Sequence, residues 1–96
     1  MHANVVKMRY KSKKDAEQAV EKLKGLADQL PGLAGFESFT LVRMGDTETM
    51  NVVRFETEEN ALRARETMIP RVKEIAGVHL AGDPEPYTGE VLVTKS

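Results

Sequence analysis

Three cationic side chains fall on the same side of two predicted strands. Lys7 and Arg9 alternate along an early run of the chain, and Arg54 occupies the equivalent side of a later run. Arginine offers a planar fork of donors to carboxylate, phenolate or enolate oxygens. We therefore predict a basic lining for a small ligand, with the hydroxyl of Thr40 on the same face. The alternative is that these cations pair with carboxylates such as Glu37, Glu48 and Glu56, or with those of a partner chain.

Other side chains could transfer or donate a proton. His79 is a candidate because imidazole exchanges protons readily near neutral pH, although a single histidine in a loop is more often structural. Tyr10 and Tyr87 carry hydroxyls that could donate to a bound oxygen substituent, and the alternative is that both fill the core. We keep Tyr10 and His79 as candidate catalytic residues.

The composition excludes several kinds of site. The chain has no cysteine, which removes disulfides, thiolate zinc sites and cysteine nucleophiles. His2 and His79 are far apart in sequence and no carboxylates cluster at a turn, so we expect no metal. The glycines do not form a phosphate-binding loop, and we expect no cofactor.

The length of 96 residues predicts one domain spanning residues 1–96. The formal charge of −1 gives no general attraction to nucleic acid or anionic lipid. No run approaches the ~20 apolar residues of a membrane span, so we expect no membrane partner. The first residues lack the apolar segment of a secretory signal, so we expect a cytoplasmic protein.

Four runs of the chain have strand character. Residues 4–11 and 49–56 alternate between two faces, and residues 36–44 are rich in β-branched and aromatic side chains. A glycine-containing turn at residues 45–47 joins the runs 36–44 and 49–56 into a hairpin. Residues 77–86 are predicted to form a loop, and residues 87–95 a final strand.

Two segments have helical spacing. Ser12 and Asp15 form a capping box before a buried stripe that continues to Leu30, and Pro31 and Gly32 end this helix. Thr57 is the predicted N-cap of the second helix, whose apolar positions keep helical spacing to residue 76. Pro70 inside it predicts a kink or the start of a new short helix.

The order βαββαβ predicts an α+β, ferredoxin-like plait. Right-handed crossovers place both helices on one face of a four-stranded antiparallel sheet, with the first and third strands in the centre. The helix-facing side is then predicted to hold Val6, Met8, Tyr10, Phe39, Leu41, Val53, Phe55, Val91 and Val93.

The other sheet face has no helix to cover it. It would carry the four predicted ligand-binding residues together with apolar Val5, Val42, Val52 and Leu92. Exposed apolar surface costs roughly 25 cal/mol per Å², so we predict that a second copy packs here as a twofold homodimer. Domains of this order that bind RNA stack bases on sheet aromatics, and the central positions here have none, so no nucleic-acid partner is expected.

Four segments of the chain resemble the dimeric α/β-barrel superfamily, and within it the small bacterial proteins similar to antibiotic biosynthesis monooxygenases. These segments are residues 31–36, 41–46, 52–57 and 89–93, so the resemblance covers essentially the full chain. It implies a homodimer in which two four-stranded sheets close into a barrel. Family members include cofactor-independent oxygenases of aromatic polyketides or quinols, haem-degrading enzymes and proteins of unassigned activity.

The same resemblance implies which chemistry to expect. Asn4 matches an asparagine of the family's pockets and is a candidate catalytic residue. The family's oxygenase and haem patterns also use a tryptophan, and the chain has none; His79 also lies outside the helix that carries the haem ligand, so we reject haem degradation. The expected function is binding of a small, largely apolar organic molecule, with oxidation of an aromatic or quinol-type substrate as the implied activity. The alternatives are a non-catalytic ligand-binding or stress-response protein and a purely structural module.

Overall fold

The computed structural model describes residues 1–95, and its strands and helices follow the predicted order. Two 3-10 helices, η1 and η2, follow the two α-helices. In chain order the elements are β1 (His2–Arg9), α1 (Lys13–Ala27), η1 (Leu30–Gly32), β2 (Phe36–Gly45), β3 (Glu48–Phe55), α2 (Glu58–Ala76), η2 (Gly77–His79) and β4 (Glu85–Glu90).

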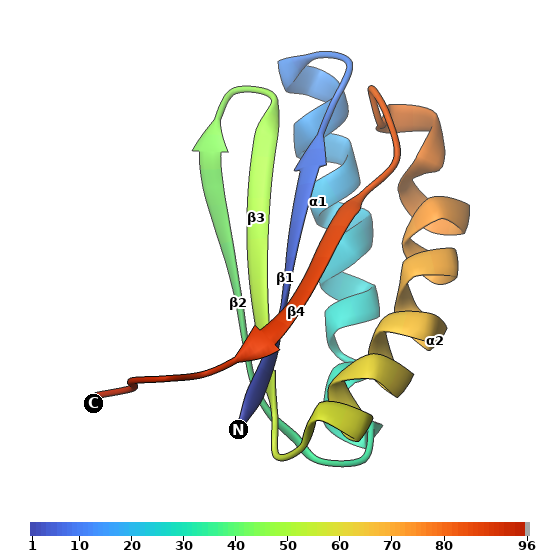
Figure 1. The fold of residues 1–96 in the computed structure, drawn as a ribbon. Helices are drawn as coiled ribbons and strands as arrows, with labels where there is room; N and C mark the ends of the chain where they lie inside the picture. The colour runs from blue at the N-terminus through green and yellow to red at the C-terminus, as the bar shows by residue number, and fades with distance from the viewer. Residues whose placement is uncertain (96) are drawn as a thin grey trace.

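The four strands form one antiparallel sheet in the order β2-β3-β1-β4. The first and third strands are central, as predicted. Both helices cover the same face, and the other face carries no element of residues 1–95 (Figure 1). The predicted ferredoxin-like plait is therefore confirmed.

A bulge near the start of β2 decides which side chains face the helices. Phe36 is opposite Phe55 and Ser38 is opposite Arg54, so Glu37 is an extra residue in β2. Because of this extra residue, Phe36 and Phe39 both face the helices although strict alternation would put them on opposite faces.

Both helices begin at the caps that the sequence predicts. The hydroxyl of Ser12 accepts a hydrogen bond from the backbone N–H of Asp15 at 3.0 Å, and the hydroxyl of Thr57 accepts one from that of Asn60 at 3.1 Å. The first helix ends earlier than predicted, at Ala27, and the chain reaches Pro31 through η1. The second helix continues through Pro70 as one element, so no new helix starts there.

The predicted boundaries of the last strand were wrong. β4 spans Glu85–Glu90, so it begins two residues earlier than predicted, inside the predicted loop, and ends before the predicted residue 95; the N–H of Val91 bonds to the carbonyl of Met1 at 3.0 Å. Glu90 is opposite His2, the first residue of β1, so the two strands end together at this edge. The segment after β4 leaves the sheet (Figure 1), and Leu92 and Val93 are 84% and 77% exposed instead of lying on strand faces.

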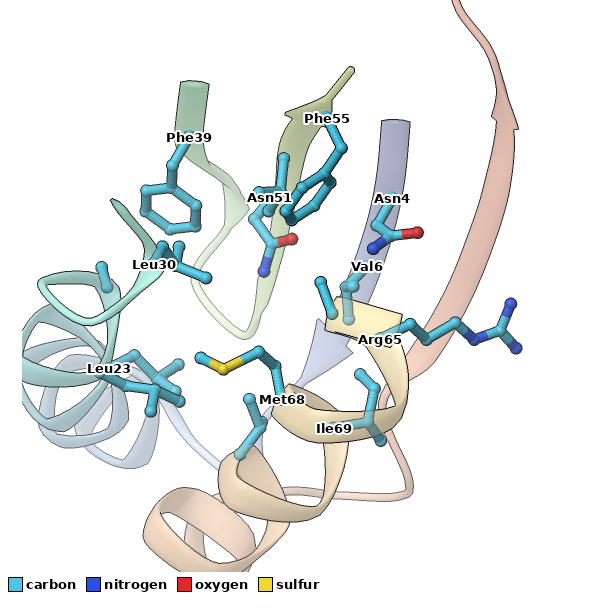
Figure 2. A pocket seen from close by; sticks show the side chains of 15 residues that line it. Asn4, Val6, Leu23, Leu30, Phe39, Asn51, Phe55, Arg65, Met68 and Ile69 are labelled. Atoms are coloured by element: carbon cyan, nitrogen blue, oxygen red, sulfur yellow. The ribbon is translucent and has the colours of Figure 1, made fainter. Parts of the chain in front are cut away.

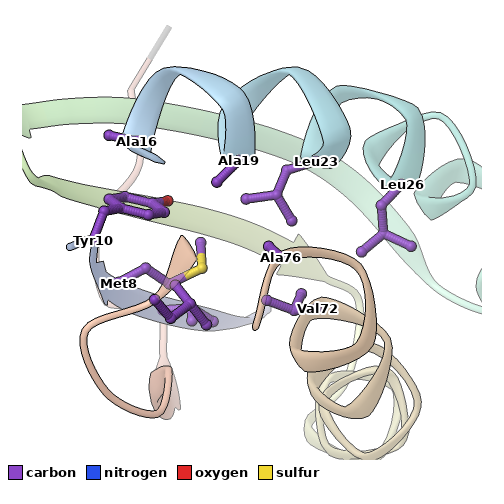
Figure 3. Packing of buried hydrophobic residues seen from close by; sticks show 10 residues of the cluster. Met8, Tyr10, Ala16, Ala19, Leu23, Leu26, Val72 and Ala76 are labelled. Carbon is purple, nitrogen blue, oxygen red and sulfur yellow. The ribbon is translucent and has the colours of Figure 1, made fainter. Parts of the chain in front are cut away.

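The core between sheet and helices consists of two clusters. The larger cluster packs Met8 of β1 and Tyr10, which follows β1, against alanines and leucines of α1 and the last turns of α2 (Figure 3). The smaller one groups Val53 and Phe55 of β3 with Leu30 and two alanines of α2. Met68 packs against both clusters, so the boundary between them lies beside this side chain.

The buried Tyr10 hydroxyl should make this core less stable at alkaline pH. Its hydroxyl shares a 2.7 Å hydrogen bond with the buried hydroxyl of Thr49, and burial raises its pKa above the ordinary 10.0. A raised pKa stabilises the fold below pH 10, and this stabilisation is lost as pH rises through the folded-state value.

We therefore expect the unfolding free energy of the native chain to fall above about pH 10 more steeply than that of Tyr10→Phe. At neutral pH, Tyr10→Phe should cost about 1–2 kcal/mol because it leaves the Thr49 hydroxyl without its partner. Urea unfolding between pH 8 and pH 11 measures both effects. Parallel pH profiles for the two proteins would contradict the role assigned to Tyr10.

Candidate functional site

A pocket lies between the sheet and the two helices, where the two core clusters meet. Its volume is about 70 Å³, and fifteen residues line it (Figure 2). Most of them are aliphatic, with the rings of Phe39 and Phe55 on the sheet side and Met68 on the helix side. Small residues, Ala27 of α1 and Ala64 of α2, line it where larger side chains would narrow it.

Asn4 brings a fixed polar group to this pocket. The side chain is buried; its Nδ2 donates to the carbonyl of Ala61 at 2.8 Å, and its Oδ1 accepts from the hydroxyl of Thr88 at 2.7 Å. Arg65 donates to the same hydroxyl at 3.3 Å. The amide that the resemblance singled out is therefore in the pocket lining, held by α2 and β4.

Asn51 brings a second amide, and this one is not fully paired. Its Oδ1 is buried and has no hydrogen-bond partner among residues 1–95. Since a buried acceptor without a partner costs about 1–3 kcal/mol, a bound donor would be favoured at this point. Figure 2 shows the Asn51 amide among the apolar side chains of the lining.

Asn51 and Arg65 were not among the site residues predicted from the sequence, although the position of each in its strand or helix pattern pointed to the inner face. Asn51 is a polar residue on the otherwise apolar face of a predicted strand. Arg65 lies four residues before Ile69 on the inward stripe of α2, and its stem lines the pocket while its guanidinium points away from it (Figure 2).

The lining contains no side chain that titrates near neutral pH. Asn4, Asn51 and Arg65 are its only polar members among the residues that the structure describes. The pocket can therefore orient a ligand by hydrogen bonds, but its own residues include no general base.

The predicted ligand-binding residues lie on the opposite, uncovered face of the sheet. Lys7, Arg9 and Thr40 are exposed there, and Arg9 lies 3.8 Å from the carboxylate of Glu85. Arg54 is half-buried and donates to the hydroxyls of Ser38 at 2.7 Å and Thr94 at 2.8 Å.

The register separates these cations. Lys7 is opposite Met50, whereas Arg54 is opposite Ala3, four residues away along β1. At about 3.3 Å per residue the two positions are about 13 Å apart. A row of four residues crosses the sheet between them, with the apolar pair Val5 and Val52 in the centre and Thr40 and Tyr87 at the two ends.

The proposed proton-transfer candidates lie away from the pocket. The Tyr10 hydroxyl is buried and engaged by Thr49, as described above. Tyr87 is 58% exposed on the uncovered sheet face, so the expectation that it fills the core was wrong.

His79 is buried in η2 and is not part of the pocket lining. Its ring nitrogens lie 2.8 Å from Asp15 Oδ1 and 3.0 Å from Lys22 Nζ. The hydrogen bond from His79, followed by that from Ser12, lowers the pKa of Asp15 below its ordinary 3.8.

Residues 1–95 contain no group of three or more histidines and carboxylates that could hold a metal ion. In the same part of the chain, no helix is both long and apolar enough to span a membrane.

Comparison with known proteins gives matches in structure but not in sequence. No protein-family model matches the chain, and no curated protein matches it. A candidate antibiotic biosynthesis monooxygenase from Nitrosomonas europaea superposes with a TM-score of 0.80 at 16% identity, over 97% of this chain and 100% of that one.

Two other solved structures have a similar fold. A monooxygenase from the ActVA-Orf6 gene of Streptomyces coelicolor, in complex with nanaomycin D, has a TM-score of 0.71 at 23% identity, over 97% of this chain and 92% of that one. A dimeric ferredoxin-like protein from an uncultured marine organism has a TM-score of 0.75 at 14% identity, over 99% of this chain and 90% of that one.

Further structural neighbours include cofactor-independent oxygenases and a protein of unknown function. All these identities are low, so the likeness concerns the fold. Over nearly its full length, the chain has the ferredoxin-like fold that antibiotic biosynthesis monooxygenases share.

Proposed function

We propose that this protein binds a small, largely apolar organic molecule that carries a hydrogen-bond donor. The observation that carries the proposal is the unpaired Asn51 oxygen in a mostly apolar pocket. Specific ligand sites combine mostly apolar walls with a few placed polar groups, and this pocket has that composition.

An aromatic ligand with a hydroxyl group matches the chemistry of this lining. The rings of Phe39 and Phe55 offer edges and faces for aromatic contact, and a phenolic hydroxyl would supply the donor that Asn51 lacks. The pocket of about 70 Å³ is smaller than the ~150 Å³ that hold benzene in an engineered cavity. Binding therefore requires the flexible Met68 side chain to move aside.

Oxidation of such a ligand by molecular oxygen is the second candidate function. Its support is the fold shared with monooxygenases, one of which was solved with nanaomycin D. A quinol supplies the electrons itself, so the pocket would need only to orient it. Because the pocket lining contains no general base, it favours non-catalytic binding over oxidation of the ligand.

Ligand binding is tested with p-cresol and toluene, which differ by one hydroxyl. We expect saturable binding of both by calorimetry, with p-cresol the tighter ligand. Asn51→Leu should weaken p-cresol about tenfold and leave toluene unchanged, because only the hydroxyl loses a partner. Thr40→Val, on the other sheet face, is the matched control and should change neither.

Two further outcomes decide between the candidate functions. Absence of saturable binding for both compounds would overturn the proposed pocket function. Protein-dependent oxygen uptake with methylhydroquinone, above the rate without protein, would favour the oxygenase, and binding without uptake would favour the non-catalytic protein.

We also propose that the functional unit is a homodimer joined through the uncovered sheet face. The half-buried row of Val5 and Val52 runs across the centre of that face, with exposed Val42 and Tyr87 nearby. Covering this row with a second copy would remove it from water.

Sedimentation should give twice the chain mass of 10.7 kDa for the native protein. Val52→Glu places a charge in the centre of the predicted interface and should yield a folded monomer with an unchanged circular dichroism spectrum. Lys7→Glu, at the exposed part of the same face, is the control. A native protein that sediments as a monomer at 100 µM would contradict the dimer.

A further inference from the structure

A second polar cluster lies where α1 meets η2. It consists of Asp15 and Lys22, which are seven residues apart and share one face of α1, and His79. None of the three lines the pocket, so this cluster is independent of the proposed ligand site.

The structure fixes His79 in place. The side chain is only 10% exposed, and its backbone carbonyl accepts a hydrogen bond from the N–H of Lys11 at 3.0 Å. Its neighbour Leu80 forms a β-bridge to Tyr10, the residue after β1. The imidazole is therefore held by the backbone on one side and by α1 on the other.

The partners of the ring decide where its proton lies. Asp15 is ionised at neutral pH, since the hydrogen bond from His79 lowers its pKa. An ionised carboxylate only accepts, so in the neutral ring Nδ1 carries the hydrogen and donates to Asp15 at 2.8 Å. Nε2 then presents its lone pair to Lys22 Nζ at 3.0 Å.

This is the order of an activated nucleophile: an amine within hydrogen-bond reach of a base, and a carboxylate that orients the base. We propose that Lys22 is a nucleophilic amine, activated by His79 and Asp15, that condenses with small aldehydes to form an imine. Lys22 is exposed, so an aldehyde can reach its Nζ. In serine triads a histidine takes the proton of a hydroxyl, which is a weaker acid than an ammonium group. The same kind of base can therefore take a proton from Lys22.

The chemistry balances without an oxidant or reductant. The ammonium of Lys22 gives one proton to Nε2 of His79, and the free amine forms a C–N bond to the aldehyde carbon. The carbonyl oxygen takes up a proton from the attacking nitrogen and becomes the hydroxyl of a carbinolamine. His79 returns its proton to that hydroxyl, which leaves as water, and a protonated imine remains on Lys22.

The same helix supplies an internal control. Lys24 is also exposed on α1, and its Nζ lies 2.8 Å from the carboxylate of Glu21. A carboxylate in direct contact stabilises the ammonium form, and no histidine contacts Lys24 in residues 1–95. A cluster that serves only as a static ion-pair network would give Lys22 no advantage over Lys24.

The test treats the native protein with benzaldehyde and sodium cyanoborohydride at neutral pH and follows labelling of each lysine by peptide mass spectrometry. We expect Lys22 to be labelled on the order of ten times faster than Lys24. The difference should vanish when the chain is unfolded in urea. Equal or slower labelling of Lys22 in the folded native chain overturns the proposal, and this comparison requires no variant.

Variants then identify the activating group. His79→Gln, verified as folded by its thermal melting curve, should reduce labelling of Lys22 to the rate of Lys24; unchanged labelling would exclude His79 as the base. If His79→Gln does not fold, Asp15→Asn replaces it and should slow Lys22 while leaving Lys24 unaffected. Asn51→Leu should not change labelling, so this site and the pocket fail or succeed separately.

Discussion

Replacing Phe55 with alanine should lower the free energy of unfolding by about 3–5 kcal/mol, the usual cost of removing a buried phenyl ring. The Phe55 side chain is fully buried. Its ring meets that of Phe36 edge to face, with centroids 6.2 Å apart and an interplanar angle of 78°. Truncation removes this contact and opens a void beside the pocket that Phe55 lines. Urea unfolding followed by circular dichroism measures the loss.

Val78→Ala is the control, because Val78 is 69% exposed and its truncation should change stability by less than about 0.5 kcal/mol. The enlarged pocket gives a second readout. Benzene should raise the melting temperature of Phe55→Ala more than that of the native protein, since the variant has the larger cavity. A loss below 1 kcal/mol would show that the surrounding side chains collapse into the space.

Gly35→Ala should cost about 2–3 kcal/mol, although it adds a single methyl group. Gly35 has a φ of 74°, a conformation that costs a residue with a Cβ roughly 1–2 kcal/mol. The added Cβ would lie 2.6 Å from Cγ of Asn60, too close for a real contact. Moving Asn60 would disturb the N-terminal cap of α2, where Thr57 and Asn60 bond to each other, at a further cost of about 1 kcal/mol.

Gly32→Ala is the matched control for this prediction. Gly32 lies in η1, three residues earlier, and a Cβ there would meet no heavy atom of residues 1–95 within 4 Å. Its unfolding free energy should stay within about 0.5 kcal/mol of the native value. Equal losses for the two alanine variants would show that neither the conformation of Gly35 nor its contact with Asn60 matters.

Most of the fold was predictable because its determinants are local. The alternation along β1, the caps at Ser12 and Thr57 and the turn after Gly45 each depend on neighbouring residues, and the structure has all of them. The end of β4 was not local. Val91 and Val93 have strand propensity, but the register places Glu90 opposite His2, the first residue of β1, and β4 ends there.

The candidate sites were predictable only in part, for the same physical reason. A sequence pattern can place Asn51 on the inner face of a strand, but whether its amide is paired depends on every group around it. The partners of His79 are likewise distant: Lys22 and Asp15 precede it by 57 and 64 residues. The cations predicted to bind a ligand share one face of the sheet, and the register, which the sequence does not give, sets how far apart they lie on it.

The extra residue in β2 affects how this chain can be aligned with its structural neighbours. At identities between 12% and 23%, an alignment of this hairpin has few matching residues to guide it. An alignment that omits this extra residue shifts the strand on one side of Glu37 by one position, which exchanges its solvent-facing and core-facing residues. Substitution patterns at Phe36 and Phe39 are therefore interpretable only in alignments that are anchored at the bulge by superposition of coordinates.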